Sequence, residues 1–206
     1  MHTAERILKA SQLLFNDAGA AAVSTNRIAT ELDISAGNLY YHFKTKEQIV
    51  EVLAGRFEQQ LTPLQGGLRS IKAVDDLWIA LHLTFEAIHD FRFLFRDADY
   101  LMHAFPGVRK RLQRITAHSL AATRALCAGL SDAGILVADP EEQHSVAFHI
   151  VFTATCWFTF AKLAPGEVSD PPDTGRAAFH VLALLMPYLT EDSRHYLRYL
   201  SSKYRV

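Results

Sequence analysis

The chain has 206 residues, of which 50% are hydrophobic, and its 21 lysines and arginines almost balance 22 aspartates and glutamates, for a formal net charge of −1. This length and composition predict a soluble globular protein with room for a small and a larger domain. The charge balance excludes a protein that coats nucleic acid without regard to sequence, and the two widely spaced thiols, Cys127 and Cys156, favour a reducing cytoplasm over a disulfide framework.

A first helix is predicted over residues 4–18. Thr3 before it is a capping residue type, and Gly19 after it is a residue type that ends helices. Apolar side chains recur at helical spacing at Ile7, Ala10, Leu14 and Ala18. This stripe predicts that the helix covers the apolar side of the segment that follows.

Residues 25–32 are predicted to form a short supporting helix. Ser24 and Thr25 are N-cap types, and the apolar stripe behind them consists of Ile28, Ala29 and Leu32. Asp33 follows where the chain must turn sharply, and aspartate is one of the few non-glycine residues that tolerate a left-handed backbone. We therefore expect the helix to end there.

A second short helix is predicted to begin after Ser35, another capping residue type. Leu39 and Phe43 lie four residues apart, so both point inward from one face of this helix. The remaining side chains share its outer surface.

That outer surface has the chemistry of a DNA contact. Ala36 and Gly37 are small, so backbone N–H groups can approach a phosphate or a base edge closely. Asn38 offers the donor and acceptor that fit adenine in the major groove, and Arg27 can reach a guanine edge or the backbone. Side chains that bond phosphate oxygens follow at Tyr40, His42 and Lys46. The predicted DNA-binding residues are Thr25, Arg27, Ala36, Gly37, Asn38, Tyr40, Tyr41, His42 and Lys46.

A further helix is predicted to begin at Thr45. Gln48 follows three residues later, which is the spacing of a capping box. With it, the segment ISAGNLYYHFKTKEQIV behind RIATEL resembles the N-terminal domain of TetR/AcrR-family bacterial transcriptional regulators. The signature positions are Leu39, Tyr40, His42, Phe43 and Lys46. Asp33 departs from the glycine that many members have at this turn, which is a mild cost because aspartate tolerates the same backbone.

The resemblance implies an all-α protein. Its N-terminal part would be a three-helix helix-turn-helix DNA-binding domain, followed by a larger helical-bundle domain for effector binding and dimerisation. Members of the family bind a double-stranded DNA operator as homodimers, and a small-molecule effector controls the spacing of the two DNA-reading heads.

Helix after helix is predicted in the remainder of the chain. The helix that begins at Lys46 is expected to end near Gln60, because Thr62-Pro63 and Gly66-Gly67 mark a break. This break divides the chain into a DNA-binding domain (1–62) and an effector-binding and dimerisation domain (63–206). Further helices are predicted near residues 77–88, 91–95, 106–134, 141–163, 176–186 and 191–204, with a loop over 165–175.

Aromatic side chains and histidines are concentrated in the second domain. They suit an apolar pocket with a few polar anchors for a hydrophobic or aromatic effector. An ordinary helical core with partly satisfied histidines is the alternative interpretation, and the family resemblance favours the pocket. The candidate pocket residues are Trp78, His82, Phe85, His89, Phe93, Tyr100, His103, Phe152 and Trp157.

Residues 141–163 and 176–186 are so apolar around their circumference that a single domain would struggle to cover them. This predicts a homodimer through these two segments, with complete burial inside one subunit as the alternative. His149, Lys162 and three threonines interrupt the apolar stretch, which lacks flanking topology signals, so we expect a buried helix and no membrane span.

The histidine pairs of the second domain are seven residues apart (His82, His89) and five apart (His144, His149), spacings that do not chelate one metal ion on their own. The sequence also lacks a glycine-rich phosphate loop, a G-x-S-x-G motif and paired cysteine ligands. We therefore expect neither an enzyme nor a cofactor.

The sequence favours a cytoplasmic, homodimeric DNA-binding regulator that acts as a repressor. The alternative is a helical ligand-binding protein whose head docks protein instead of DNA. The basic C-terminal stretch that includes Arg194, Arg198, Lys203 and Arg205 is interpreted as a solvated helix face, in preference to a second nucleic-acid patch.

Overall fold

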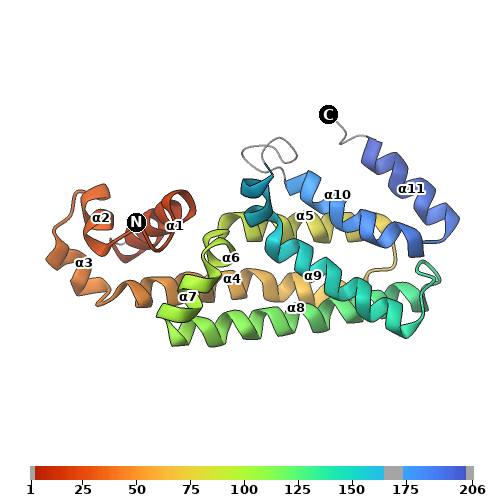
Figure 1. The fold of residues 1–206 in the computed structure, drawn as a ribbon, viewed down its shortest axis with the longest axis horizontal. Coiled ribbons are helices and arrows are strands. Elements are labelled where there is room, and N and C mark those ends of the chain that lie inside the picture. Colours follow the sequence, from red (N-terminus) through yellow and green to blue (C-terminus); the bar gives the residue numbers. More distant parts are fainter. Residues whose placement is uncertain (1–2, 165–173, 203–206) are drawn as a thin grey trace. The chain divides into compact units, whose positions relative to one another are not determined.

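The computed structural model describes residues 3–164 and 174–202, and its regular structure in these ranges is helical (Figure 1). An isolated antiparallel bridge joins Leu136 and Leu189. The predicted all-α fold is confirmed. Most of the loop predicted at 165–175 lies outside the described residues, as do Lys203 and Arg205 of the basic C-terminal stretch.

Side-chain caps at Ser24, Ser35, Thr45 and Asp139 begin four of the described helices. The α-helices are α1 (Thr3–Ala18), α2 (Thr25–Glu31), α3 (Ala36–His42), α4 (Lys46–Gly67), α5 (Val74–Asp90), α6 (Phe93–Arg96), α7 (Ala98–Ala104), α8 (Pro106–Asp132), α9 (Pro140–Leu163), α10 (Thr174–Leu185) and α11 (Glu191–Ser202). Short 3-10 helices follow α4 and α10 at η1 (Leu68–Ser70) and η2 (Met186–Tyr188). Asp139 caps α9 with a capping box. The Asp139 carboxylate accepts from the Glu142 backbone N–H, and the Glu142 carboxylate accepts from the Asp139 backbone N–H.

The end of α4 differs from the sequence prediction, which placed it near Gln60. The helix continues through Pro63 to Gly67. A proline inside a helix removes one backbone donor and crowds the preceding turn. Packing outweighs that cost here, because Leu61 is only 4% exposed and the Gln65 side chain donates a hydrogen bond to Ser119 of α8.

A helix that the sequence did not predict, α7, follows α6 after a single residue, Asp97. Its seven residues bury one side chain, Leu101, completely. One buried position gives no helical periodicity to detect, so the sequence pattern could not distinguish this helix from a loop.

The contacts divide the chain into two compact units. The first consists of residues 1–59 together with residues 90–114, and the second of residues 60–89 together with residues 115–206. Helices α4 and α8 each contribute to both units. The division at residue 62 concerned functional domains, and it stays a prediction.

In the first unit, α1, α2 and α3 pack on one another and α6 packs on α1 and α4. The ring centroids of Phe15 and Phe93 lie 5.3 Å apart, and the ring of Phe57 lies 5.6 Å from Phe91 and 5.5 Å from Phe95. These distances are those of favourable aromatic pairs. The aromatic residues around α6 therefore belong to the core of the unit that holds the helix-turn-helix.

In the second unit, α8 and η1 approach closely at Gly129. A Cβ atom at this position would lie 2.7 Å from the backbone carbonyl oxygen of Arg69. Backbone atoms cannot swing aside as a flexible side chain does, so glycine is required at this contact.

By length and composition, α9 is the one helix of the described residues that is apolar enough to cross a membrane, and 33% of that stretch is buried inside the structure.

The Gly129→Ala substitution should lower the free energy of unfolding by roughly 1–3 kcal/mol, because the added methyl group overpacks the contact with Arg69. Gly66→Ala is a matched control, since beyond its chain neighbours and the backbone of its own helix no described atom lies within 4 Å of the added methyl group. A helical alanine there should stabilise the protein by about 0.5–1 kcal/mol. Urea unfolding monitored by circular dichroism measures the unfolding free energy of both variants. A Gly129→Ala variant as stable as the unmodified protein would contradict the close approach.

Candidate nucleic-acid interface

Serine caps begin both helices of the predicted helix-turn-helix. The Ser24 hydroxyl accepts a hydrogen bond from the Arg27 backbone N–H at 3.2 Å. The Ser35 hydroxyl accepts one from the Asn38 backbone N–H at 3.1 Å. Each cap satisfies a backbone donor that the first turn of the helix leaves unpaired, and so fixes where α2 and α3 begin.

The turn between α2 and α3 has the predicted left-handed residue. Asp33 has a φ of 52°. Among the described residues, it is the non-glycine residue with a positive φ. The turn is closed by a hydrogen bond from the Ile34 N–H to the Ala29 carbonyl at 3.0 Å, and Arg6 of α1 donates to the Leu32 carbonyl at 3.3 Å. Helix α1 therefore supports the turn directly.

Most of the predicted DNA-binding side chains lie on the surface of this helix pair. The exposed ones are Arg27, Ala36, Gly37, Asn38, Tyr40, Tyr41 and His42. Tyr40 is 58% exposed and Tyr41 is 77% exposed, which is unusual for aromatic residues without a partner surface. The inward-pointing Leu39 is only 2% exposed, as predicted.

A hollow of about 340 Å³ lies between α2 and α3. It brings together four of the predicted DNA-binding residues, which are Thr25, Ala36, Gly37 and Tyr40. Lys44 lines the same hollow, and its ammonium lies 4.4 Å from the centroid of the Tyr40 ring. The sequence reasoning missed Lys44. Lysines lie on both sides of Thr45 in the sequence, and only Lys46 was predicted to bind DNA.

Lys46, the selected lysine, is placed differently. Its ammonium donates a hydrogen bond to the Ala20 carbonyl at 2.8 Å and lies 5.2 Å from the centroid of the Tyr100 ring. The residue is half-buried, unlike the exposed Lys44.

At the beginning of α4, the Thr45 cap is confirmed, whereas the Gln48 side chain pairs with the residue before the cap and not with the backbone of Thr45. The Gln48 N–H donates to the Thr45 hydroxyl at 3.2 Å, and the Gln48 side-chain oxygen accepts from the Lys44 N–H at 2.7 Å. The backbone on either side of Thr45 is therefore held in one conformation, and this conformation directs Lys44 and Lys46 to different surroundings.

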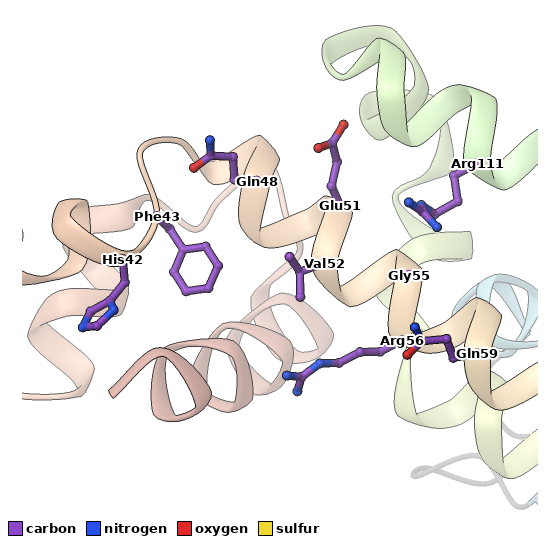
Figure 2. Close-up of a pocket in the computed structure, with 9 residues that line it drawn as sticks. All are labelled: His42, Phe43, Gln48, Glu51, Val52, Gly55, Arg56, Gln59 and Arg111. Atoms are coloured by element: carbon purple, nitrogen blue, oxygen red, sulfur yellow. The ribbon is translucent and has the colours of Figure 1, made fainter. Parts of the chain in front are cut away.

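A second hollow, of about 630 Å³, begins at His42 and Phe43, follows one side of α4 to Gln59 and reaches Arg111 of α8 (Figure 2). Its guanidinium groups are engaged in ion pairs. Arg56 donates to both carboxylate oxygens of Glu5 at 2.7 and 2.6 Å, and Arg111 donates to Glu58. These pairs hold α4 to α1 and to the first part of α8.

The candidate effector residues are divided between the two units. In the second unit, Trp78, Phe85 and Trp157 are buried, whereas Phe152 is 55% exposed. His82 stacks on Trp78 with ring centroids 6.2 Å apart. His89 lies 5.6 Å from Phe158, an aromatic residue outside the predicted set.

The other three candidates lie in the first unit. Phe93 packs on Phe15, Tyr100 faces the Lys46 ammonium, and His103 is exposed on α7. Six of the nine candidates thus belong to the second unit and three to the first, and the pocket stays a prediction. The sequence carries no signal for this division, since it depends on which distant helix each aromatic side chain meets.

Two candidates of the second unit have unpaired polar atoms. Nδ1 of His82 and Nε1 of Trp157 are buried and have no hydrogen-bond partner among the described residues. Buried polar atoms are normally paired, so an unpaired one calls for a partner group.

Two family models match the chain. One, described as bacterial regulatory proteins of the tetR family, matches residues 7–53. The other, described as bacterial transcriptional repressor, matches residues 56–197, which is more than half of the chain.

A solved structure of a TetR-family transcriptional regulator from Marinobacter aquaeolei VT8 is similar over 100% of both chains, with 32% identity and a TM-score of 0.86. The transposon Tn10 TetC protein of Escherichia coli is 28% identical over 89 residues, which are 43% of this chain and 44% of that protein. The HTH-type transcriptional repressor KstR2 of Mycolicibacterium smegmatis is 37% identical over 65 residues, which are 28% of this chain and 32% of that protein. The chain thus matches less than half the length of these two curated relatives.

The ion pairs on α4 predict a loss of stability in acid. Hydrogen bonds from Arg114, and then from Arg111, lower the pKa of the Glu58 carboxyl. A lowered pKa in the folded state means that this stabilisation is present above the pKa of the unfolded chain and is lost as the pH falls through the folded-state value. Glu58→Gln should therefore cost about 1 kcal/mol or less at neutral pH and flatten the acid limb of the stability curve.

Urea unfolding between neutral and acid pH measures this effect. Glu31→Gln is the control, because Glu31 is exposed on α2 and has no ion partner among the described residues. An acid limb that stays unchanged in Glu58→Gln would show that the pairs with Arg111 and Arg114 contribute nothing.

Proposed function

Because the chain belongs to the TetR family of bacterial transcriptional regulators and carries its DNA-binding helix-turn-helix, we propose that it is a cytoplasmic repressor that binds a palindromic operator as a homodimer and is released by a small hydrophobic effector. The observation that carries this proposal is the α2–α3 pair, which is capped at both helices and exposes its polar and aromatic side chains. In this proposal residues 1–62 bind DNA and residues 63–206 bind the effector and the second subunit.

The exposed side chains of the pair divide the work of recognition. Asn38 and Arg27 carry the groups that read adenine and guanine edges. Tyr40 and His42 offer hydrogen-bonding groups that suit phosphate oxygens, which position the protein without reading sequence. A net charge of −1 leaves each head few phosphate contacts, so two linked heads on a palindrome supply the affinity that one lacks.

The homodimer is supported by an exposed aromatic stripe on α9. Phe148, Phe152 and Phe160 are 50%, 55% and 53% exposed, and the rings of the first two stack with centroids 6.3 Å apart. Their spacing of four and eight residues aligns them on one side of the helix. Large apolar groups in such a row mark a contact surface, so we infer that a second copy covers α9 and, with it, α10.

Effector release is supported by two features. The unpaired Nδ1 of His82 and Nε1 of Trp157 are groups that a ligand's polar end can satisfy. The end of α5 is bonded to the head, because the Asp90 carbonyl accepts hydrogen bonds from Gln12 and Asn16 of α1 at 2.8 and 2.7 Å. A ligand that binds along α5 with unequal affinity for two states therefore shifts the head between them.

The proposal is tested by selection of bound duplexes from a random pool with the purified full chain. We expect a palindrome whose half-sites are spaced about one helical turn apart, roughly 34–36 Å, or slightly more. Enrichment of single half-sites would contradict the dimer. Absence of enrichment would favour the alternative, in which the head docks protein.

Base reading by Asn38 is tested with the selected operator. Asn38→Ala should weaken operator binding by roughly 1–3 kcal/mol and leave binding to random DNA nearly unchanged, because an asparagine–adenine pair discriminates between bases. Tyr40→Phe is the control, since loss of a phosphate contact weakens binding to all sequences alike. Titration of both duplexes measures the two variants. An equal loss on both duplexes for Asn38→Ala would exclude base reading by this residue.

A further inference from the structure

Two lysines flank Thr45, and the structure gives them opposite surroundings. We infer that Lys46 and Tyr100 are positioning residues that hold the helix-turn-helix in its DNA-binding form, and that Lys44 supplies the charge that meets phosphate. The inference rests on the proposed DNA-binding function and changes the role that the sequence suggested for Lys46.

The Lys46 ammonium is occupied inside the first unit. It donates to the Ala20 carbonyl at 2.8 Å, and Ala20 itself is completely buried. The face of the Tyr100 ring lies 5.2 Å away, within the range of a cation–π contact. A phosphate would have to compete with both partners for this ammonium.

The position of Lys46 in its helix explains why these partners are needed. It is the first residue of α4. The N-terminus of a helix carries a partial positive charge, so a lysine there is disfavoured unless acceptors neutralise it. The Ala20 carbonyl and the electron-rich face of Tyr100 are such acceptors.

The bond to Ala20 fixes the turn that leads into the helix-turn-helix. The Ala20 N–H donates to the Asp97 carboxylate at 2.6 Å, so side chains hold this residue through both its N–H and its carbonyl. Arg96, which pairs with Asp97 at 3.1 Å, also donates to the Phe15 carbonyl at the end of α1. The path from α1 to α2 is therefore set by α4, α6 and α7 together.

Lys44 has none of these ties. It is exposed, it lines the hollow between α2 and α3, and its ammonium lies 4.4 Å from the ring centroid of the exposed Tyr40. The two side chains share one face of the reading surface, where an ammonium and a phenol meet a phosphate together.

The salt dependence of DNA binding separates the two roles. Each phosphate that a protein neutralises contributes about −0.9 to the slope of log K against log salt for duplex DNA. With the full chain and its selected operator, Lys44→Ala should therefore reduce the magnitude of the slope by about 0.9 per head. Lys46→Met and Tyr100→Leu should lower operator affinity by about tenfold, the order expected for one charge-assisted hydrogen bond, and leave the slope unchanged. Tyr100→Phe keeps the ring face and should bind like the unmodified protein.

Two results overturn the inference. A slope reduced by Lys46→Met as much as by Lys44→Ala would show that Lys46 meets phosphate. Unmodified affinity in Lys46→Met or in Tyr100→Leu would show that the contact positions nothing. If one of these two variants does not fold, the other still decides between these outcomes.

Amide hydrogen exchange without DNA tests the same contact independently of the proposed function. Lys46→Met and Tyr100→Leu should accelerate exchange across residues 19–24, whereas Lys44→Ala should not. Unchanged exchange in the first two variants would contradict the positioning role even if the protein binds no duplex. Failure of the unmodified protein to bind any duplex, with exchange accelerated as expected, would refute the proposed function alone.

Discussion

The hydrogen bonds between the end of α1 and α6 are the constraint on which the helix-turn-helix depends. Asn16, only 6% exposed, donates to the Asp90 carbonyl at 2.7 Å and accepts from the Phe93 N–H at 3.1 Å. Arg96 donates to the Phe15 and Asn16 carbonyls at 2.6 and 2.7 Å. Buried polar groups in such a network support one another, because loss of one member leaves its partners desolvated and unpaired.

This network joins α6 to α1, and α7 belongs to the same compact unit. Around it, Phe93 packs on Phe15, and the ring of Phe57 meets those of Phe91 and Phe95. Two of the three helices at the N-terminus, α2 and α3, have only seven residues each. Helices of this length are not stable by themselves, so they take their order from what they pack against. In the proposed repressor, a movement of Asp90 at the end of α5 would therefore move α1, which is bonded to it.

The sequence was sufficient wherever the determining contact is local. The Ser24 and Ser35 caps, the left-handed Asp33 and the capping box of Asp139 each involve groups within a few residues, and each was predictable from residue type and spacing. The family was predictable for the same reason, since its signature is a set of such local features at fixed offsets.

Long-range contacts could not be predicted in this way. Asn16 meets Phe93, and Ala20 meets Asp97, each 77 residues further along the chain. The contacts of Phe93 with Phe15 and of Tyr100 with Lys46 were not predictable either, because the type of an aromatic side chain does not indicate which helix it will contact. The continuation of α4 past Pro63 has the same origin, because contacts made by Gln65 and Leu61 override a local signal.

The central claim is that α1 and the segment 93–104 form one cooperative unit with the helix-turn-helix. Native-state amide hydrogen exchange in low concentrations of denaturant measures this directly, because segments that open together share one opening free energy and one denaturant dependence. The structure predicts coincident values for the slowest amides of α1 and those of α6 and α7. Earlier, independent opening of α1, α2 and α3 while residues 93–104 stay protected would contradict it.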